Sequence, residues 1–289
     1  MVCCGIRAPW EPRGPLTDRW YNGLVAQSTG TPGFGKSQSV KRTLAELGVA
    51  IIALVILFLV ARFALGCAAE SLATQLPLSV DEQIGKAGAE QLRSKYDLGR
   101  RPTDEQIKRV DRIFNELRAA LTDEDAEILK NPRVTVVADP QVNAFALPGG
   151  EVFVLTGLLE RVGDDDDLVR GVLAHELGHA VKRHGIRGLA RKTAFFAVVA
   201  MLVGDVDGMV VLLAEGASQL DGLSHSRSME TEADLFGVDL LKRAGHDPDG
   251  LARFLESLDS APVPELLSTH PDPRERAAAI RELAKAGGG

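Results

Sequence analysis

The sequence predicts a mainly α-helical α+β protein, because helical patterns of apolar residues surround one short group of β-branched segments. After residue 80, apolar side chains recur every three or four positions over most of the chain, whereas residues 133–156 read as short strands separated by turn residues. The 289 residues are 45% hydrophobic and 25% charged, as in ordinary globular proteins, which disfavours a polytopic membrane protein or a disordered chain. This length allows one large or two small domains.

The formal net charge of −7 is divided unevenly along the chain. Residues 1–66 contain seven Lys or Arg and three Asp or Glu, a net +4, so the remainder carries −11. An acidic body offers no basic face to phosphates, and we expect no nucleic-acid partner. The three cysteines, Cys3, Cys4 and Cys67, lie outside this body, which therefore has no disulfide framework and no thiolate metal site.

The N-terminal part is predicted to be a disordered leader followed by a membrane segment. Residues 1–43 are rich in Gly, Pro and Ser and have no lasting apolar period, and residues 44–69 form a transmembrane anchor or signal segment. Leu47–Ala61 contains no charge, and if Arg62 extends its side chain to an interface, residues 47–69 can cross the roughly 30 Å hydrocarbon core. A buried core helix is the alternative, but the segment lacks a polar face.

The charges on either side of this segment predict its orientation. Lys41 and Arg42 precede it and Glu70 follows it, so the positive-inside rule places the N-terminus in the cytoplasm. The acidic body then lies on the extracytoplasmic (periplasmic) side of a cell membrane, behind a single-pass anchor. Two alternatives remain open: cleavage as a signal peptide, and lipidation at Cys67, which follows Ala64-Leu-Gly in a lipoprotein-like box.

The acidic body is predicted to contain helices before and after a small sheet. Helical periodicity covers Val80–Asp97, and Thr103-Asp-Glu-Gln106 is a capping box that begins a second helix. The strands are expected at Arg133–Ala138, Asn143–Leu147 and Glu151–Thr156. Four aspartates at 164–167 suit the N-terminus of a further helix, which extends to about His184, where Gly185 can end it.

That further helix contains a His-Glu-x-x-His motif, His175-Glu176-Leu-Gly-His179. Histidines four residues apart lie about 40° from each other around a helix, so both rings can bind one ion from adjacent turns. Glu176 lies beside them and can accept a proton from a reacting water. The alternative is a structural pair of exposed histidines, but the helical period and the acidic start of the helix favour a metal site.

Zinc needs a third protein ligand, and the sequence favours an acidic helix face over a nearby histidine. His184 lies five residues after His179, which turns its side chain about 140° away on a continuous helix, so we assign it to the polar helix end. Glu230 and Asp234 share one face at four-residue spacing. One of them can bind zinc while the other accepts a ring N–H from a ligating histidine.

Together these motifs resemble the CAAX prenyl protease/HtpX family of zinc metallopeptidases, nearest its Oma-like and BepA-like membrane-associated branch. The resemblance rests on the His-Glu-x-x-His motif and on Ser-Arg-x-x-Glu-x-Glu-Ala-Asp at Ser226–Asp234, and extends over about residues 80–282. It includes Asn143–Gly150 and Gly157–Leu159. It implies a zincin-like helical protease domain over residues 80–285, with a small edge sheet beside the active-site helix.

The resemblance also implies roles for individual residues. One zinc ion per chain would be held by His175, His179 and Glu230. Glu176 would be the general base, and Asp234 would orient a zinc ligand.

A cleft for protein or peptide substrates follows from the same resemblance. A peptide would add through main-chain hydrogen bonds to an edge strand formed by Glu151, Val152, Phe153 and Val154. In similar proteases the histidine of Thr269-His270-Pro faces the zinc, as a removable fourth ligand or as a partner of the oxyanion, and Arg276 supports it. Either His270 or Arg276 would then stabilise the oxyanion during catalysis. Taken by itself, His270 before a proline is a turn residue.

A second apolar region, residues 193–214, separates the two zinc motifs. Its halves, Thr193–Gly204 and Gly208–Ala214, are each too short to cross a bilayer. In the HtpX-like branch this region spans the membrane, but here we expect a helical hairpin against the membrane or over the cleft, with ordinary core as the alternative. His225 and His246 match no motif, and we assign them to surface or capping positions.

The expected function is therefore that of a membrane-anchored zinc endopeptidase that cleaves misfolded or membrane-associated proteins in quality control. Two alternatives remain: a non-enzymatic, zinc-stabilised chaperone or binding module, and a prenyl-protein protease. The prenyl-protein protease is the less favoured alternative, because such enzymes enclose the cleft with many membrane-spanning helices, whereas this sequence has one convincing span. No pattern in the sequence sets an oligomeric state.

Overall fold

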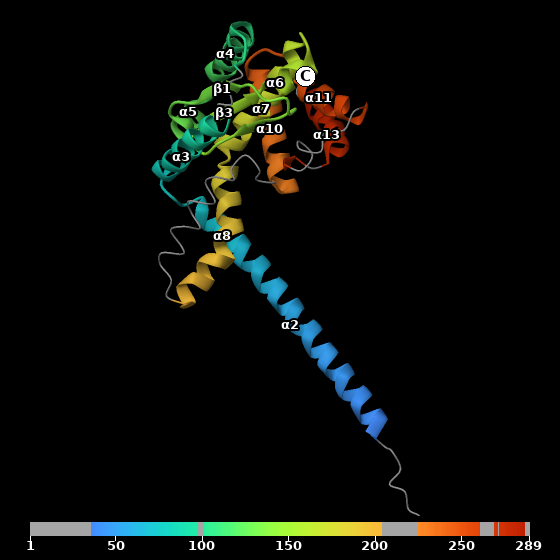
Figure 1. Ribbon diagram of the computed structural model, residues 1–289. Coiled ribbons are helices and arrows are strands. Elements are labelled where there is room, and N and C mark those ends of the chain that lie inside the picture. Colours follow the sequence, from blue (N-terminus) through green and yellow to red (C-terminus); the bar gives the residue numbers. More distant parts are fainter. Residues whose placement is uncertain (1–35, 97–100, 204–224, 261–268, 271, 287–289) are drawn as a thin grey trace, which may run out of the picture. The chain divides into compact units, whose positions relative to one another are not determined.

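A computed structural model describes residues 36–96, 101–203, 225–260, 269–270 and 272–286 (Figure 1). The chain divides into two compact units, Met1–Phe58 and Leu59–Gly289. Helices dominate both the N-terminal part and the body, and three short strands lie in the middle of the sequence. The predicted fold class, mainly α with a small sheet, is confirmed.

The helices and strands follow the sequence periodicity closely. In chain order they are α2 (Lys36–Ala73), α3 (Leu78–Tyr96), α4 (Asp104–Ala119), α5 (Asp123–Leu129), β1 (Arg133–Val137), β2 (Ala144–Ala146), β3 (Glu151–Leu155), α6 (Thr156–Val162), α7 (Asp166–Val181), α8 (His184–Val203), α10 (Arg227–Arg243), α11 (Gly250–Ser260) and α13 (Pro273–Ala286).

Helix α2 contains the predicted membrane segment. It begins at Lys36, earlier than the predicted boundary at residue 44, and residues 1–35 of the predicted leader lie outside the described part of the chain. Its large apolar side chains are exposed. By length and composition, Lys41–Ala73 can cross a membrane, and among the described residues it is the one helix that can.

The capping box predicted for the second helix of the body is present at the start of α4. Thr103 Oγ1 accepts the Gln106 backbone N–H at 3.2 Å, and the Gln106 side chain accepts the Thr103 N–H at 2.9 Å. These two bonds satisfy groups that the first helical turn otherwise leaves without partners. A local pattern of four residues thus sets the start of this helix.

The three predicted strands form one sheet in the order β1-β3-β2. Strand β1 pairs in parallel with β3, with Thr135 opposite Phe153, and β2 pairs antiparallel with β3, with Phe145 opposite Phe153. The turn between β2 and β3 uses Gly149 and Gly150 at φ of 81° and 92°, a conformation that residues with side chains rarely adopt.

The expectation that residues Glu151–Val154 form an edge strand is wrong. Strand β3 is the central strand, because β1 returns to its other side, so both of its backbone edges are already hydrogen-bonded. Val152, Phe153 and Val154 are fully buried. The antiparallel edge strand of the described sheet is β2.

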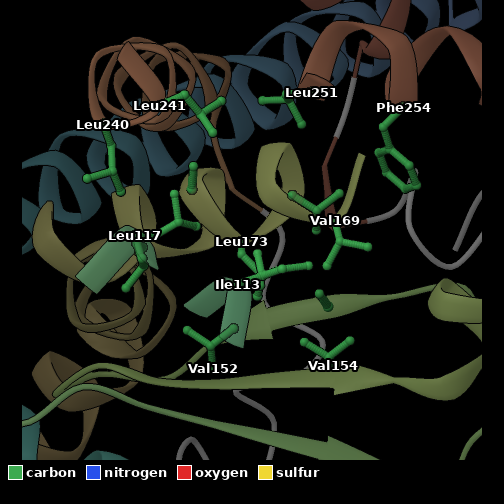
Figure 2. Close-up of a cluster of buried hydrophobic side chains, with 14 of the residues drawn as sticks. Ile113, Leu117, Val152, Val154, Val169, Leu173, Leu240, Leu241, Leu251 and Phe254 are labelled. Atoms are coloured by element: carbon green, nitrogen blue, oxygen red, sulfur yellow. The ribbon is translucent and has the colours of Figure 1, made fainter. Parts of the chain in front are cut away.

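Helix α7 lies at the centre of the hydrophobic core. Val169 and Leu173 on α7 contact a cluster that also takes in α4, β3, α10 and α11 (Figure 2). Twelve of its sixteen residues are buried, so the helix is apolar on nearly all sides, as a helix surrounded by others must be. The motif His175–His179 is therefore carried by the most enclosed helix of the body.

The second apolar region falls partly inside α8. Its first half, from Thr193 to Val203, continues this helix, and its second half lies outside the described residues. The predicted hairpin over residues 193–214 therefore stays a prediction.

The contact between α7 and α11 yields a stability test. A Cβ placed on Gly171 would lie 2.2 Å from the backbone N of Leu251, and this backbone cannot move away without displacing α11. Gly171→Ala should therefore destabilise the fold by at least about 2 kcal/mol, although alanine is the better helix former. Calorimetry should show a Tm at least about 4 °C lower. Gly48→Ala, with no atom within 4 Å of its new methyl group, is the control, and an unchanged Tm for Gly171→Ala would contradict the packing.

Candidate metal centre

Helix α7 contains three predicted site residues, and its N-terminus is fixed by a capping side chain. Asp165 caps its N-terminus by accepting the N–H groups of Asp167 and Leu168. His175, Glu176 and His179 are all buried, with exposed fractions of 2–3%. Acidic side chains at the N-terminus also suit the helix dipole, as the aspartate run predicts.

The end of α7 differs from the prediction. The helix stops at Val181 instead of continuing to His184, and Arg183 adopts a left-handed conformation with φ of 56° before α8 begins at His184. Arg183 is held there by a bidentate pair with the buried carboxylate of Asp81 and by a hydrogen bond to the carbonyl of Thr74. The position of His184 therefore does not follow from the periodicity of α7.

Helix α10 brings the second motif onto α7. Glu230 and Asp234 are buried on its inner face. The helices approach closely because of two glycines: a Cβ on Gly178 would lie 2.9 Å from the Ala233 carbonyl oxygen, and a Cβ on Gly237 would lie 3.2 Å from the His175 N. Residues separated by fifty positions in the sequence thus meet around one point.

Four candidate ligand atoms converge there, all within 4.8 Å of one another, from His175, His179, Glu230 and His270. The Nε2 atoms of His175 and His179 are 2.9 Å apart, and Oε1 of Glu230 lies 3.3 Å from Nε2 of His179. His270 Nδ1 is 3.2 Å from the Glu230 carboxylate. Imidazole nitrogens with one carboxylate oxygen are a zinc donor set, so these residues fit that ion.

Glu176 faces the same space without belonging to the four-residue cluster. Its Oε1 lies 3.6 Å from Nε2 of His270, and its carboxylate accepts the backbone N–H of Ala146. Burial raises the pKa of Glu176, although the neighbouring histidines oppose this shift. A buried carboxylate with a raised pKa is suited to accept and return a proton.

Asp234 and Arg276 lie behind His175. Asp234 Oδ1 is 2.9 Å from Nδ1 of His175, and Arg276 donates to both Asp234 oxygens, from Nη2 at 2.7 Å and from Nε at 2.8 Å. Burial alone would raise the pKa of Asp234, but the hydrogen bonds from Arg276 and His175 lower it, so the carboxylate is ionised. Arg276 also forms an ion pair with Glu230.

Among the described residues, the edge of the sheet nearest the site is formed by β2, which pairs with β3 on one side only. Leu147 N–H donates to Glu151 and Leu155 N–H donates to Asn143, so odd-numbered residues of this strand pair with β3. The backbone groups of Ala144 and Ala146 consequently point to the other side, away from β3. Glu151, predicted to contact substrate, instead forms an ion pair with Arg93 and accepts a hydrogen bond from Thr135 at 2.9 Å.

Two histidines that the sequence analysis set aside lie against the centre. His184 was assigned to a polar helix end, but it is completely buried, and its Nδ1 lies 2.8 Å from Nδ1 of His179. His225 was assigned to a surface or capping position, but its ring stacks on His179, with centroids 3.9 Å apart and planes 30° apart. Burial lowers the pKa of His184 to about 4, so this ring is neutral.

The sequence contained no clear signal for either histidine. The spacing argument against His184 assumes an unbroken helix, and the left-handed residue that breaks it is an arginine rather than a glycine or asparagine. His225 precedes the N-cap Ser226 of α10, and its backbone N–H donates to the Thr269 carbonyl beside His270. These are contacts between distant segments, which a sequence pattern does not show.

A buried cluster of histidines and a carboxylate beside a buried glutamate, on a helix enclosed by the core, has the residue types found in the sites of metallopeptidases. The chain belongs to peptidase family M48, whose sequence model matches residues 105–284. The family resemblance found in the sequence is thereby confirmed, and the chain contains a metallopeptidase domain.

Similar proteins come from eukaryotes and bacteria. The mitochondrial metalloendopeptidase OMA1 of Schizosaccharomyces pombe is 38% identical over 164 residues, 51% of this chain and 45% of that protein. The beta-barrel assembly-enhancing protease of Escherichia coli is 30% identical over 230 residues, 74% of this chain and 46% of that protein. The metalloprotease YcaL of Escherichia coli is 35% identical over 169 residues, 54% of this chain and 63% of that protein. The chain thus spans about half the length of these relatives.

The contact between Asp234 and His175 predicts an effect on metal affinity. Asp234→Asn removes the negative charge that accepts the His175 ring N–H while keeping the size of the side chain, so zinc affinity should fall about 10- to 100-fold. Competition with a chromogenic chelator measures it. Asp239→Asn, on the exposed side of the same helix, is the matched control. Equal affinities of the two variants would exclude this role for Asp234.

Proposed function

We propose that the chain is a zinc-dependent endopeptidase that hydrolyses peptide bonds of protein substrates, with Glu176 as its general base. The observation that carries the proposal is the convergence of three imidazoles, one carboxylate and a separate buried glutamate at one point. One zinc ion per chain would be held by His175, His179 and Glu230. Zinc bound there would polarise the substrate carbonyl and lower the pKa of a water molecule.

Glu176 would move the proton. Its carboxylate accepts a proton from the attacking water and later delivers it to the nitrogen of the leaving amine. The hydrogen bond from the Ala146 N–H holds the carboxylate in place, and burial keeps its pKa high enough for the proton to be returned. The proposed base thus links the metal centre to strand β2.

His270 is proposed as a fourth, removable ligand or as a partner of the reacting oxyanion. Its Nδ1 contacts Glu230, and its Nε2 faces Glu176, so it borders both the ligand set and the base. Arg276 was expected to assist at the oxyanion. Since its guanidinium is engaged by Asp234 and Glu230, we propose that it holds these two carboxylates instead.

We propose that peptide substrates pair with the free edge of β2. Helix α7 packs against this strand, and the outward backbone N–H of Ala146 bonds to Glu176. An extended peptide can add to such an edge through main-chain hydrogen bonds and be read by shape rather than by sequence. Misfolded or membrane-associated proteins would supply such segments.

Membrane anchoring is proposed through residues 47–69 of α2. The exposed apolar side chains and the length of the helix support a single span, and the flanking charges support an extracytoplasmic position of the protease domain. Residues 193–214 would form a second membrane contact. Retention of the segment as an anchor, its cleavage, and lipidation at Cys67 give different masses for the mature chain.

A second candidate function is a zinc-stabilised binding module without proteolytic activity. One observation favours it: with His270, the cluster contains four protein donors, as structural zinc sites do, whereas catalytic sites keep one position open. Proteolysis by the purified chain separates the two functions. A prenyl-protein protease receives no such support, since the described residues contain one candidate span.

The proposed base has a direct test in Glu176→Gln. This variant keeps the size of the side chain and the three proposed ligands, so it should bind zinc at the wild-type stoichiometry while losing at least about 100-fold in peptide cleavage. Cleavage of an unfolded fluorescent casein measures activity, and elemental analysis measures zinc. Glu160→Gln, at an exposed position of α6, should leave both unchanged. Undiminished cleavage by Glu176→Gln would exclude it as the base.

Removal of the metal should lower both stability and activity. The buried carboxylate of Glu230 faces three imidazoles, and an ion bound among them adds to folding stability by about 4 kcal/mol when present at 1,000 times its Kd. Treatment with a chelator should lower the Tm and abolish cleavage. Zinc should restore both, whereas Mg²⁺ or Ca²⁺ should not, because these ions prefer all-oxygen sites. Full restoration by Mg²⁺ would contradict the proposed donor set.

A further inference from the structure

The two histidines on α7 have different partners at their outer nitrogens. Nδ1 of His175 lies against Asp234, which Arg276 holds. Nδ1 of His179 lies 2.8 Å from Nδ1 of His184 instead. Among the described residues, no carboxylate contacts Nδ1 of His179, and the completely buried ring of His184 occupies this position.

Only one arrangement of protons satisfies both rings if His179 binds zinc through Nε2. The proton of His179 must then lie on Nδ1, so it donates to Nδ1 of His184, and the proton of His184 must lie on Nε2. That Nε2 is 3.2 Å from Oε2 of Glu232, an acceptor. The two rings and the carboxylate form a continuous series of hydrogen bonds that fixes the tautomer of the ligand.

Glu232 is itself held in place. Arg187 donates to it from Nη1 at 2.8 Å, and the same guanidinium donates from Nη2 at 2.9 Å to Oε1 of Glu70. Glu70 belongs to α2, within the stretch long and apolar enough to cross a membrane. The polar contacts thus continue from the metal centre to the last turn of that stretch.

We propose that His184 and Glu232 are positioning residues for the zinc ligand His179, and that Arg187 and Glu70 extend this relay to α2. The relay parallels the pair of Asp234 and Arg276 behind His175, with one imidazole inserted between ligand and carboxylate. The inference rests on the proposed function, because it requires His179 to bind zinc. Partners of this kind orient the ring and raise its strength as a donor, and their loss typically costs 10- to 100-fold in metal affinity.

Two substitutions of His184 test whether it acts through its hydrogen bonds or only by filling space. His184→Leu removes both hydrogen bonds, and zinc affinity should fall about 10- to 100-fold. His184→Asn retains an acceptor near the position of Nδ1 but cannot reach Glu232, so its affinity should lie between those of His184→Leu and the wild type. The full chain is used in detergent, and chelator competition measures the affinity.

The visible absorption spectrum of the Co²⁺-substituted protein provides a second test. This spectrum should not change if His184 and Glu232 only stabilise the fold. Because the relay changes the donor strength of His179, His184→Leu and Glu232→Gln should shift the visible absorption bands of the Co²⁺ protein, with a smaller effect for Glu232→Gln. Glu232 is partly exposed, so its substitution is compatible with folding even if His184→Leu proves unstable. The Tm of the metal-free proteins reports folding separately.

A matched pair on α8 tests the extension to α2. Arg187 and Arg191 both contact Glu70, but of these two side chains only Arg187 contacts Glu232 in the described part of the chain. Arg187→Gln should therefore weaken zinc binding severalfold and Arg191→Gln should not. Equal effects of the two variants would overturn the extension.

The outcomes also distinguish this inference from the proposed function. A wild-type chain that binds no zinc would overturn both. A wild-type chain that binds zinc while His184→Leu, His184→Asn and Glu232→Gln keep its affinity and its Co²⁺ spectrum would overturn the relay and leave the zinc peptidase in place.

Discussion

The structure depends on the close backbone contact between α7 and α10. Gly178 and Gly237 have no side chains to hold the helices apart, and the carbonyl of Ala233 and the backbone of His175 occupy the space. Without this approach, His175 and His179 could not share an ion with Glu230. The same contact sets the depth of the site, because α7 is enclosed by the sheet and by the other helices on its remaining sides. The packing of the core and the assembly of the candidate metal site therefore both require this close approach of the two helices.

Because the metal centre is buried, its charged side chains are unfavourable unless they are paired. The arrangement of the surrounding side chains provides these partners. Burial alone would raise the pKa of Glu230 and of Asp234, but the neighbouring imidazoles lower the pKa of Glu230, and Arg276 together with His175 lowers the pKa of Asp234. A buried charge is tolerated when it is paired and hydrogen-bonded. Arg276 contributes to two carboxylates at once, which explains why an arginine with a forked guanidinium suits this position better than a lysine.

Local sequence patterns predicted much of the fold and most of the candidate site residues, whereas pairings between distant segments could not be predicted. The capping box at Thr103 and the spacing of His175 and His179 act within one helix, where periodicity applies. The central position of β3 depends on which strand returns beside it, and the hydrophobic pattern does not encode this order. His184 was misassigned because Arg183 changes the chain direction with no glycine to indicate it.

The shortness of β2 has a consequence for how substrates are selected. The strand has three residues, and Ala146 already gives its N–H to Glu176, so few main-chain groups remain for a peptide. Binding through so few hydrogen bonds is weak when the peptide is free in solution. The proposed membrane tether would raise the effective concentration of substrates on the same membrane to about the millimolar range that short linkers achieve. On the proposed mechanism, the enzyme would select substrates by their position, because unfolded segments close to the membrane anchor would be cut first.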